Sequence, residues 1–227
     1  MSINQNQDLK DTGYQIKDLK IALKDLEPMV KGTDRKGRLF LINGNNSVKK
    51  SDTIEVDNGD TFRMRRIEAW GNWLLCVVFI YAHKQDYTFQ DDSTGDGIIL
   101  NKTTGRWFQV EHVSAMDYQK GGDVPKGDDR LLWAINKKIE KTKKNPNYAK
   151  DKSLVVFFDG AEEWHPNKVG RYIDGKHEFA CVYGIGLISN ENDEYTYSVT
   201  EFNKTHSPTF IVKINQNFTD WNVTQIQ

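Results

Sequence analysis

Two regions of the chain carry apolar residues at the spacing of an amphipathic helix. The first predicts a helix over residues 14–31 that ends near Pro28, because four apolar residues share one face: Ile16, Leu19, Leu23 and Leu26. The second predicts a helix from about Phe62 to Ala82. Its longest apolar run, from Trp73 to Ala82, is ten residues long. Such a run is too short to cross a bilayer and indicates a buried element.

The remaining apolar segments are short and favour strands. They occupy residues 38–42, 85–90, 95–100, 106–115, 153–160, 179–189 and 194–202. Between them, a lysine-rich helix is predicted from about Arg130 to Lys144, with Asp128 or Asp129 as its N-cap. A shorter helix is predicted over 165–173. The order of these elements predicts an α/β domain with a mixed central sheet flanked by helices.

Composition narrows the class of protein. The chain has 227 residues, of which 37% are hydrophobic and 28% charged, so it suits one large globular domain, with or without an extension. The formal net charge of −1 gives no overall basic excess, so nucleic-acid binding would need a local patch. Cys76 and Cys181 lie in apolar runs and are expected to be reduced core thiols. The N-terminal residues lack the apolar core of a signal peptide, so a cytoplasmic protein without a membrane segment is expected.

Two carboxylates are predicted to face each other across a β-hairpin. Gly105 stands where a type I turn with a bulge requires a left-handed residue. If Thr103 and Thr104 form the tip, Asp96 lies opposite Glu111, with Cβ atoms about 4.5–5.5 Å apart. Like charges so placed repel, and a divalent cation between them would remove the repulsion. The alternative is an acid pair at the sheet edge that points to solvent.

A third carboxylate, Glu68, lies on the apolar side of the helix predicted over 62–82. A buried carboxylate is costly unless a partner compensates its charge. Gly71, one turn further along, leaves room beside Glu68. The alternative is a salt bridge from Glu68 to Arg65 or Arg66.

These segments together resemble the PD-(D/E)XK nuclease superfamily. The resemblance rests on three segments that each carry one acid: RRIEAWGNWLL with Glu68, GDGIIL with Asp96, and QVEHVSA with Glu111. Two later segments, AINKKIEK and SLVVFFDG, are similar to the second half of that fold. It covers about residues 60 to 190. It implies a restriction-endonuclease-like domain over 56–227, preceded by an N-terminal helical extension over 1–55. The chain departs from the family pattern at Val113, where the family has a lysine two residues after the glutamate.

Lys138 is a candidate for the missing lysine. A helical projection puts it inside the apolar arc of its helix. The arc contains Leu131, Leu132, Ala134, Ile135 and Ile139. Three other lysines fall outside it, on the solvent side: Lys137, Lys141 and Lys144. Transfer of the lysine to this helix is similar to what some members of the superfamily do. The alternative is that Lys138 lays its aliphatic stem over apolar surface.

The resemblance implies a nuclease that hydrolyses phosphodiester bonds with Mg²⁺ or Mn²⁺. It assigns the metal to Asp96, Glu111 and Glu68, and the activation of water to Lys138. The exposed lysines would bind nucleic-acid phosphates, with DNA favoured over RNA as the substrate. A homodimer would suit cleavage of both strands of a duplex. His112 points to the opposite face of the strand from Glu111.

Other functions remain open at the level of sequence. One is an inactive nucleic-acid-binding or assembly protein on the same fold, favoured by Val113. Another is a different metal-dependent hydrolase or an unrelated α/β binding module. Glu162, Glu163 and His165 form an alternative acidic cluster. Phosphate-binding loop, dinucleotide-binding and nucleophile-elbow motifs are absent from the sequence.

Overall fold

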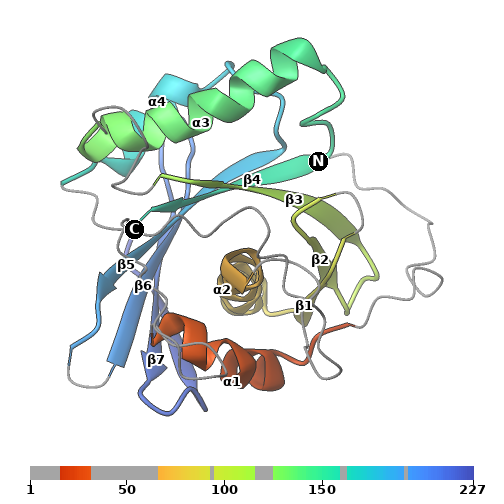
Figure 1. The fold of residues 1–227 in the computed structure, drawn as a ribbon, viewed down its shortest axis with the longest axis vertical. Helices are drawn as coiled ribbons and strands as arrows, with labels where there is room; N and C mark the ends of the chain where they lie inside the picture. The colour runs from red at the N-terminus through yellow and green to blue at the C-terminus, as the bar shows by residue number, and fades with distance from the viewer. Residues whose placement is uncertain (1–15, 32–65, 93–94, 116–124, 159–162, 192–193) are drawn as a thin grey trace.

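The protein is built around a curled mixed sheet (Figure 1). The computed structural model describes residues 16–31, 66–92, 95–115, 125–158, 163–191 and 194–227. Within these residues, eight strands lie in sequence order across the sheet. They are β1 (Tyr87–Gln90), β2 (Ile98–Asn101), β3 (Trp107–Ser114), β4 (Lys152–Phe158), β5 (Cys181–Ser189), β6 (Glu194–Glu201), β7 (Thr209–Asn215) and β8 (Trp221–Gln225). Strand β4 pairs in parallel with β3 and β5, and the other neighbouring pairs are antiparallel.

The described helices lie on both faces of this sheet. They are α1 (Leu19–Val30), α2 (Arg66–His83), α3 (Gly127–Lys144) and α4 (Pro166–Ile173). Figure 1 shows α2 inside the curl of the sheet with α1 beside it, and α3 and α4 across the opposite face. The α/β class with a mixed sheet, predicted from the sequence, is confirmed. No described helix combines the length and the apolar character needed to span a membrane.

Several element boundaries differ from those predicted. Helix α1 continues through Pro28 to Val30 and packs in the same core as α2. The strand predicted over 38–42 and the helical start over 62–65 lie outside the described residues. The sequence patterns predict strands only as far as residue 202, whereas β7 and β8 extend the sheet beyond it. In β8 only Trp221 and Val223 are apolar, so its signal is weak, whereas TFIVKIN of β7 has a strand-like pattern that was not recognised.

Two hydrophobic cores share the sheet. On β4, Val155 and Phe157 face the core built on α1 and α2, whereas Leu154 and Val156 face the core built on α3 and α4. This burial on both faces explains the continuous apolar run over 153–158. In β5, Gly186 lies beneath the Phe158 ring, and a Cβ atom there would be 2.4 Å from that ring.

Asp128 connects α3 to α4 rather than capping its own helix. Helix α3 begins at Gly127, so the prediction that Asp128 or Asp129 is the N-cap is wrong. The buried carboxylate of Asp128 accepts a hydrogen bond from the backbone N–H of His165 (2.6 Å) and pairs with Lys168 Nζ (2.8 Å). His165 and Glu163, from the predicted acidic cluster, therefore belong to this connection; Glu162 lies outside the described residues.

Replacing Asp128 with alanine is expected to destabilise the protein by about 1–3 kcal/mol, because the partly buried hydrogen bond from the His165 N–H loses its charged acceptor. Burial raises the pKa of Asp128, but the hydrogen bonds from Lys168 and His165 outweigh this, and the pKa is lowered overall. The contribution of Asp128 is therefore present above its unfolded pKa of about 3.9 and lost as the pH falls through the lower folded value. Urea denaturation at neutral and acidic pH measures it. Asp129→Ala, at an exposed acid in the same turn, is the control; an equal loss there would contradict the assignment.

Candidate functional site

The centre of the candidate site is the Glu111 carboxylate on β3. Its Oε2 atom accepts hydrogen bonds from Lys138 Nζ on α3 (2.9 Å) and from the Tyr148 hydroxyl (2.5 Å). The other oxygen, Oε1, lies 3.5 Å from Lys152 Nζ at the start of β4. The side chains of Glu111 and Lys138 are each only 10% exposed. The site therefore holds one carboxylate between two lysines and a tyrosine, at the boundary between sheet and helix.

These contacts determine the protonation states at neutral pH. Burial raises the pKa of Glu111, but hydrogen bonds from Tyr148 and Lys138 and the charges of Lys138 and Lys152 lower it overall. Burial and the hydrogen bond to Glu111 raise the pKa of Tyr148, and the charges of Glu111 and Asp96 raise it further. Glu111 is therefore ionised and Tyr148 keeps its proton.

Asp96 lies where the β2–β3 ladder opens. Ile98 pairs with Gln109 and Leu100 with Trp107, in the predicted register, and Gly105 has the predicted positive φ of 73°. The backbone pairing continues to Val110, which donates to the Gly97 carbonyl (2.9 Å) and accepts from the Asp96 N–H (3.2 Å), and the ladder opens beyond it. Because residues 96 and 97 both bond to Val110, Asp96 and Glu111 are not ladder partners as predicted. Instead, Asp96 Oδ2 accepts a hydrogen bond from the backbone N–H of His112 (2.7 Å).

The backbone of β3 also directs an oxygen atom to this opening. The N–H and C=O of one strand residue point to the same side of the strand. His112 donates its N–H toward Asp96, so its carbonyl is directed toward the same opening. The Asp96 backbone carbonyl accepts from Asn72 Nδ2 on α2 (3.1 Å), which anchors the segment.

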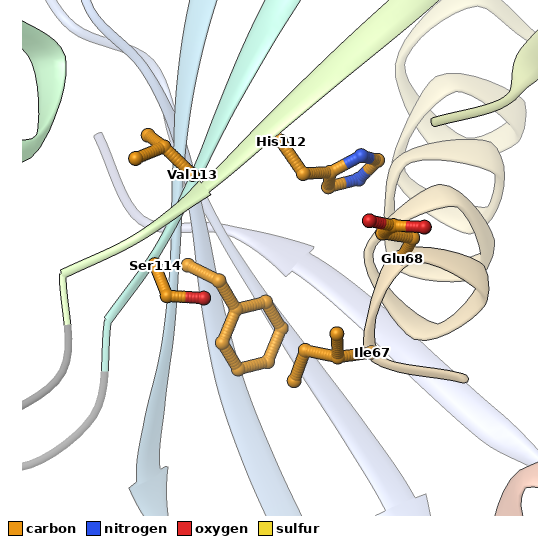
Figure 2. A pocket seen from close by; sticks show the side chains of 6 residues that line it. Ile67, Glu68, His112, Val113 and Ser114 are labelled. Carbon is orange, nitrogen blue, oxygen red and sulfur yellow. The ribbon is translucent and has the colours of Figure 1, made fainter. Parts of the chain in front are cut away.

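Glu68 is separated from Glu111 by the sheet. It is buried on α2, as predicted, and lines a cavity of about 210 Å³ together with His112 and Ser114. Figure 2 shows the Glu68 carboxylate facing the His112 ring from α2. His112 points away from Glu111, as predicted, and a Cβ atom at Gly71 would be 2.9 Å from its Nε2. The structure brings Lys138 to Glu111 and Asp96 to the adjoining backbone, but it does not bring Glu68 to them.

The lysines of α3 are distributed as the helical projection predicts. Lys138 is buried at Glu111, whereas Lys137, Lys141 and Lys144 are exposed. Lys137 Nζ lies 3.1 Å above the Trp133 ring centre, and Lys141 Nζ lies 5.4 Å from the ring centre of Tyr148. The exposed lysines therefore form a stripe along α3 that reaches the candidate site.

Sequence reasoning missed Tyr148 and Lys152. Both follow α3 in the polar segment NPNYAKDK, where periodicity gives no signal. The one indication was Tyr148 itself, because a large aromatic residue in an otherwise polar connection has a packing or binding role more often than its polar neighbours do.

The carboxylates at this end of β3 are donors of the type that hard divalent cations prefer. Among the described residues, no group of three or more His, Cys, Asp or Glu side chains is arranged to hold a metal ion. Magnesium is commonly held through one or two carboxylates and water. Asp96, which binds the His112 backbone, and Glu111 are two carboxylates on adjoining segments. Comparison with protein-family models, with curated proteins and with solved structures finds no match for the chain.

Proposed function

We propose that the protein is a metal-dependent nuclease that hydrolyses phosphodiester bonds, with DNA as the preferred substrate. The observation that carries the proposal is the 2.9 Å contact between Lys138 Nζ and Glu111. This contact supplies a lysine beside Glu111 of β3. Val113 occupies the position, two residues after the glutamate, where the PD-(D/E)XK superfamily has its lysine. The order α2, β1, β2, β3, α3, β4 supports the restriction-endonuclease-like fold, and 56–227 is the proposed extent of the domain.

Each residue has a role that follows from its contacts. Asp96, Glu111 and the His112 carbonyl would hold Mg²⁺ or Mn²⁺. When bound, the metal supplies Lewis acidity and lowers the pKa of water. Tyr148 and Lys138 both bind Oε2 of Glu111, so a cation would have to bind Oε1, which lies 3.5 Å from Lys152 Nζ. Lys138 and Lys152 place positive charge where the phosphate would lie.

The exposed lysine stripe supplies the substrate contacts. Lys137, Lys141 and Lys144 can neutralise backbone phosphates without reading bases. Their alignment along one helix leads a bound strand toward Tyr148 and Glu111. Glu68, across the sheet, has no direct part in this arrangement.

A second function is favoured by the charge balance at Glu111. Two lysines and a tyrosine already compensate this carboxylate, so the cluster is stable without a cation. An inactive nucleic-acid-binding or assembly protein on the same fold would keep this cluster as part of its core.

Cleavage of labelled DNA and RNA, in single- and double-stranded form with Mg²⁺ or Mn²⁺, tests the proposal. Asp96→Asn keeps an acceptor for the His112 N–H but removes the charge, and it is expected to lower the rate by about 100-fold or more. Lys138→Ala is expected to lower turnover sharply, whereas Lys137→Ala should weaken binding of the substrate. Circular dichroism checks that each variant folds.

The matched control is Asp174→Asn, at an exposed acid paired with Lys204. It should cleave as the wild type does, and calorimetry should detect metal binding to the wild type and the control but not to Asp96→Asn. Absence of both cleavage and metal binding in the wild type would overturn the nuclease. Salt-dependent DNA binding in that case would support the second function.

A further inference from the structure

The two edges of the sheet differ in how they are covered. At the β1 edge, Lys17 N–H donates to the Phe89 carbonyl (3.0 Å), and the Thr88 hydroxyl donates to the Lys17 carbonyl. Strand β8 forms the other edge, and no described strand lies on its outer side. Natural sheets usually protect an edge with lysine, proline or a bulge. The sequence of β8, WNVTQ, has no charged residue and no proline.

The hydrogen-bond pattern identifies the backbone groups on this outer side. Ile226 N–H donates to the Thr209 carbonyl (2.9 Å), and Asn215 N–H donates to the Asp220 carbonyl (3.2 Å). Residues 220 and 226 thus face β7, and so do 222 and 224, because the direction alternates along a strand. The N–H and C=O groups of Trp221, Val223 and Gln225 therefore point outward.

A groove runs beside these outward groups. It has a volume of about 590 Å³ and is bounded by β8 and by the second half of α2. Val77, Ile80 and Tyr81 of α2 form its apolar floor, and Trp221 and Val223 form one wall. Figure 1 shows α2 inside the curl of the sheet, so a strand added at β8 would cover this part of the helix. The site thus offers backbone hydrogen bonds next to an apolar surface, the combination by which strands add to a sheet.

We propose that the protein forms a homodimer in which β8 pairs antiparallel with β8 of a second copy, about a two-fold axis at Val223. In this register Val223 faces Val223 of the partner subunit, and Trp221 faces Gln225 of the partner subunit. Val223 would exchange both of its backbone hydrogen bonds with the other copy. The Trp221 N–H already donates to Asp220 Oδ1 (2.9 Å), so the Trp221 pair would use the Trp221 carbonyl as the acceptor.

Charge favours a second copy as the occupant of the groove. A two-fold interface must complement itself. Self-pairing of β8 brings no like charges together, because the strand is uncharged. The rim of the groove carries Asp86, paired with Lys102 (2.8 Å), and Lys84, which lies 4.2 Å from the Tyr81 ring centre. The charges of the rim are thus balanced within one copy, and two rims can approach without repulsion.

Disulfide cross-linking tests the register. In a hydrogen-bonded antiparallel pair the Cα atoms are about 5.5 Å apart, within the range that a disulfide spans. Val223→Cys is therefore expected to form a covalent dimer under mild oxidation. Thr224→Cys is the matched control, because its two copies would be about 8 Å apart, too far for a disulfide. The wild type, with Cys76 buried and Cys181 partly buried, gives the baseline.

Analytical ultracentrifugation tests the dimer itself. The wild type is expected to dimerise reversibly at about 10–100 µM. Val223→Pro removes an outward N–H and should give a folded monomer, since proline is tolerated where the N–H of an edge strand faces solvent. Gln225→Pro, at an exposed residue whose N–H also points outward, is a second test if the Val223 variant fails to fold, because Val223 is buried. A monomeric wild type over this range, or equal cross-linking of Val223→Cys and Thr224→Cys, would overturn the proposal.

Discussion

Replacing Lys138 with methionine is expected to destabilise the protein by about 3–5 kcal/mol. Methionine keeps most of the aliphatic volume but removes the amine 2.9 Å from Glu111. The carboxylate would then stay buried with the Tyr148 hydroxyl and the more distant Lys152 as its remaining partners. Urea denaturation at neutral pH measures the loss. Lys143→Met, at an exposed lysine of the same helix paired with Glu140, should change the free energy of unfolding by only about 0.5 kcal/mol.

A double-mutant cycle separates the ion pair from packing. Glu111→Gln combined with Lys138→Met removes both charges, so the double variant should lose less than the sum of the two single losses. Additive losses would show that Lys138 contributes through its aliphatic chain and not through its charge.

The pH dependence gives a second check on the same pair. The folded pKa of Glu111 is lowered, so the contribution of the pair is present above the unfolded pKa of about 4.3 and lost as the pH falls through the folded value. Without Lys138, burial raises the pKa of Glu111. The difference between wild type and Lys138→Met should therefore be largest near neutral pH and shrink below about pH 4. A difference that does not change with pH would contradict the role of the charge.

Substitution of Gly170 by alanine is expected to cost about 3 kcal/mol or more. Gly170 lies in α4 against the backbone that follows β6. A Cβ atom there would be 2.1 Å from the carbonyl oxygen of Asn203 and 2.8 Å from its carbonyl carbon. Because the obstruction is backbone, no change of rotamer relieves it. Either α4 or the Asn203 segment must move away from the second core.

Thermal unfolding of Gly170→Ala measures this cost. Gly175→Asn is the control, because a Cβ atom at Gly175 would have nothing within 4 Å and the φ of 68° there is one that asparagine tolerates. Its stability should stay within about 1 kcal/mol of the wild type. A Gly170→Ala protein as stable as the control would show that α4 packs less closely on Asn203 than described.

Sequence patterns predicted the structure correctly where the local signal and the tertiary packing favour the same arrangement. The β2–β3 register followed from the position of Gly105, because a left-handed glycine determines which residues flank a tight turn. The burial of Lys138 followed from helical periodicity, because the same arc holds the apolar residues that contact the sheet. In both cases the signal lies within a few residues of the feature.

Features that depend on distant segments had no such signal. Asp96 was predicted to pair with Glu111, but Asp96 and Gly97 both bond to the Val110 backbone, and the Asp96 side chain accepts from the His112 N–H. Asp128 was predicted to cap its own helix, but α4 lies close enough to use its carboxylate. In each case the carboxylate accepts a hydrogen bond from the backbone of a residue more than ten positions away, instead of making the predicted contact.

The sequence by itself determined the α/β class, the hairpin register, the inward position of Lys138 and the outward positions of Lys137, Lys141 and Lys144. These depend on turn chemistry and on the periods of helix and strand, which are local properties. Only the tertiary structure decided that Tyr148 and Lys152 reach Glu111, that Glu68 lies across the sheet from it, and that β8 forms an edge with no described strand on its outer side. These features depend on which elements pack together and on which face of the curled sheet each side chain lies. Both are determined by contacts between segments that are far apart in the sequence, so no local pattern reveals them.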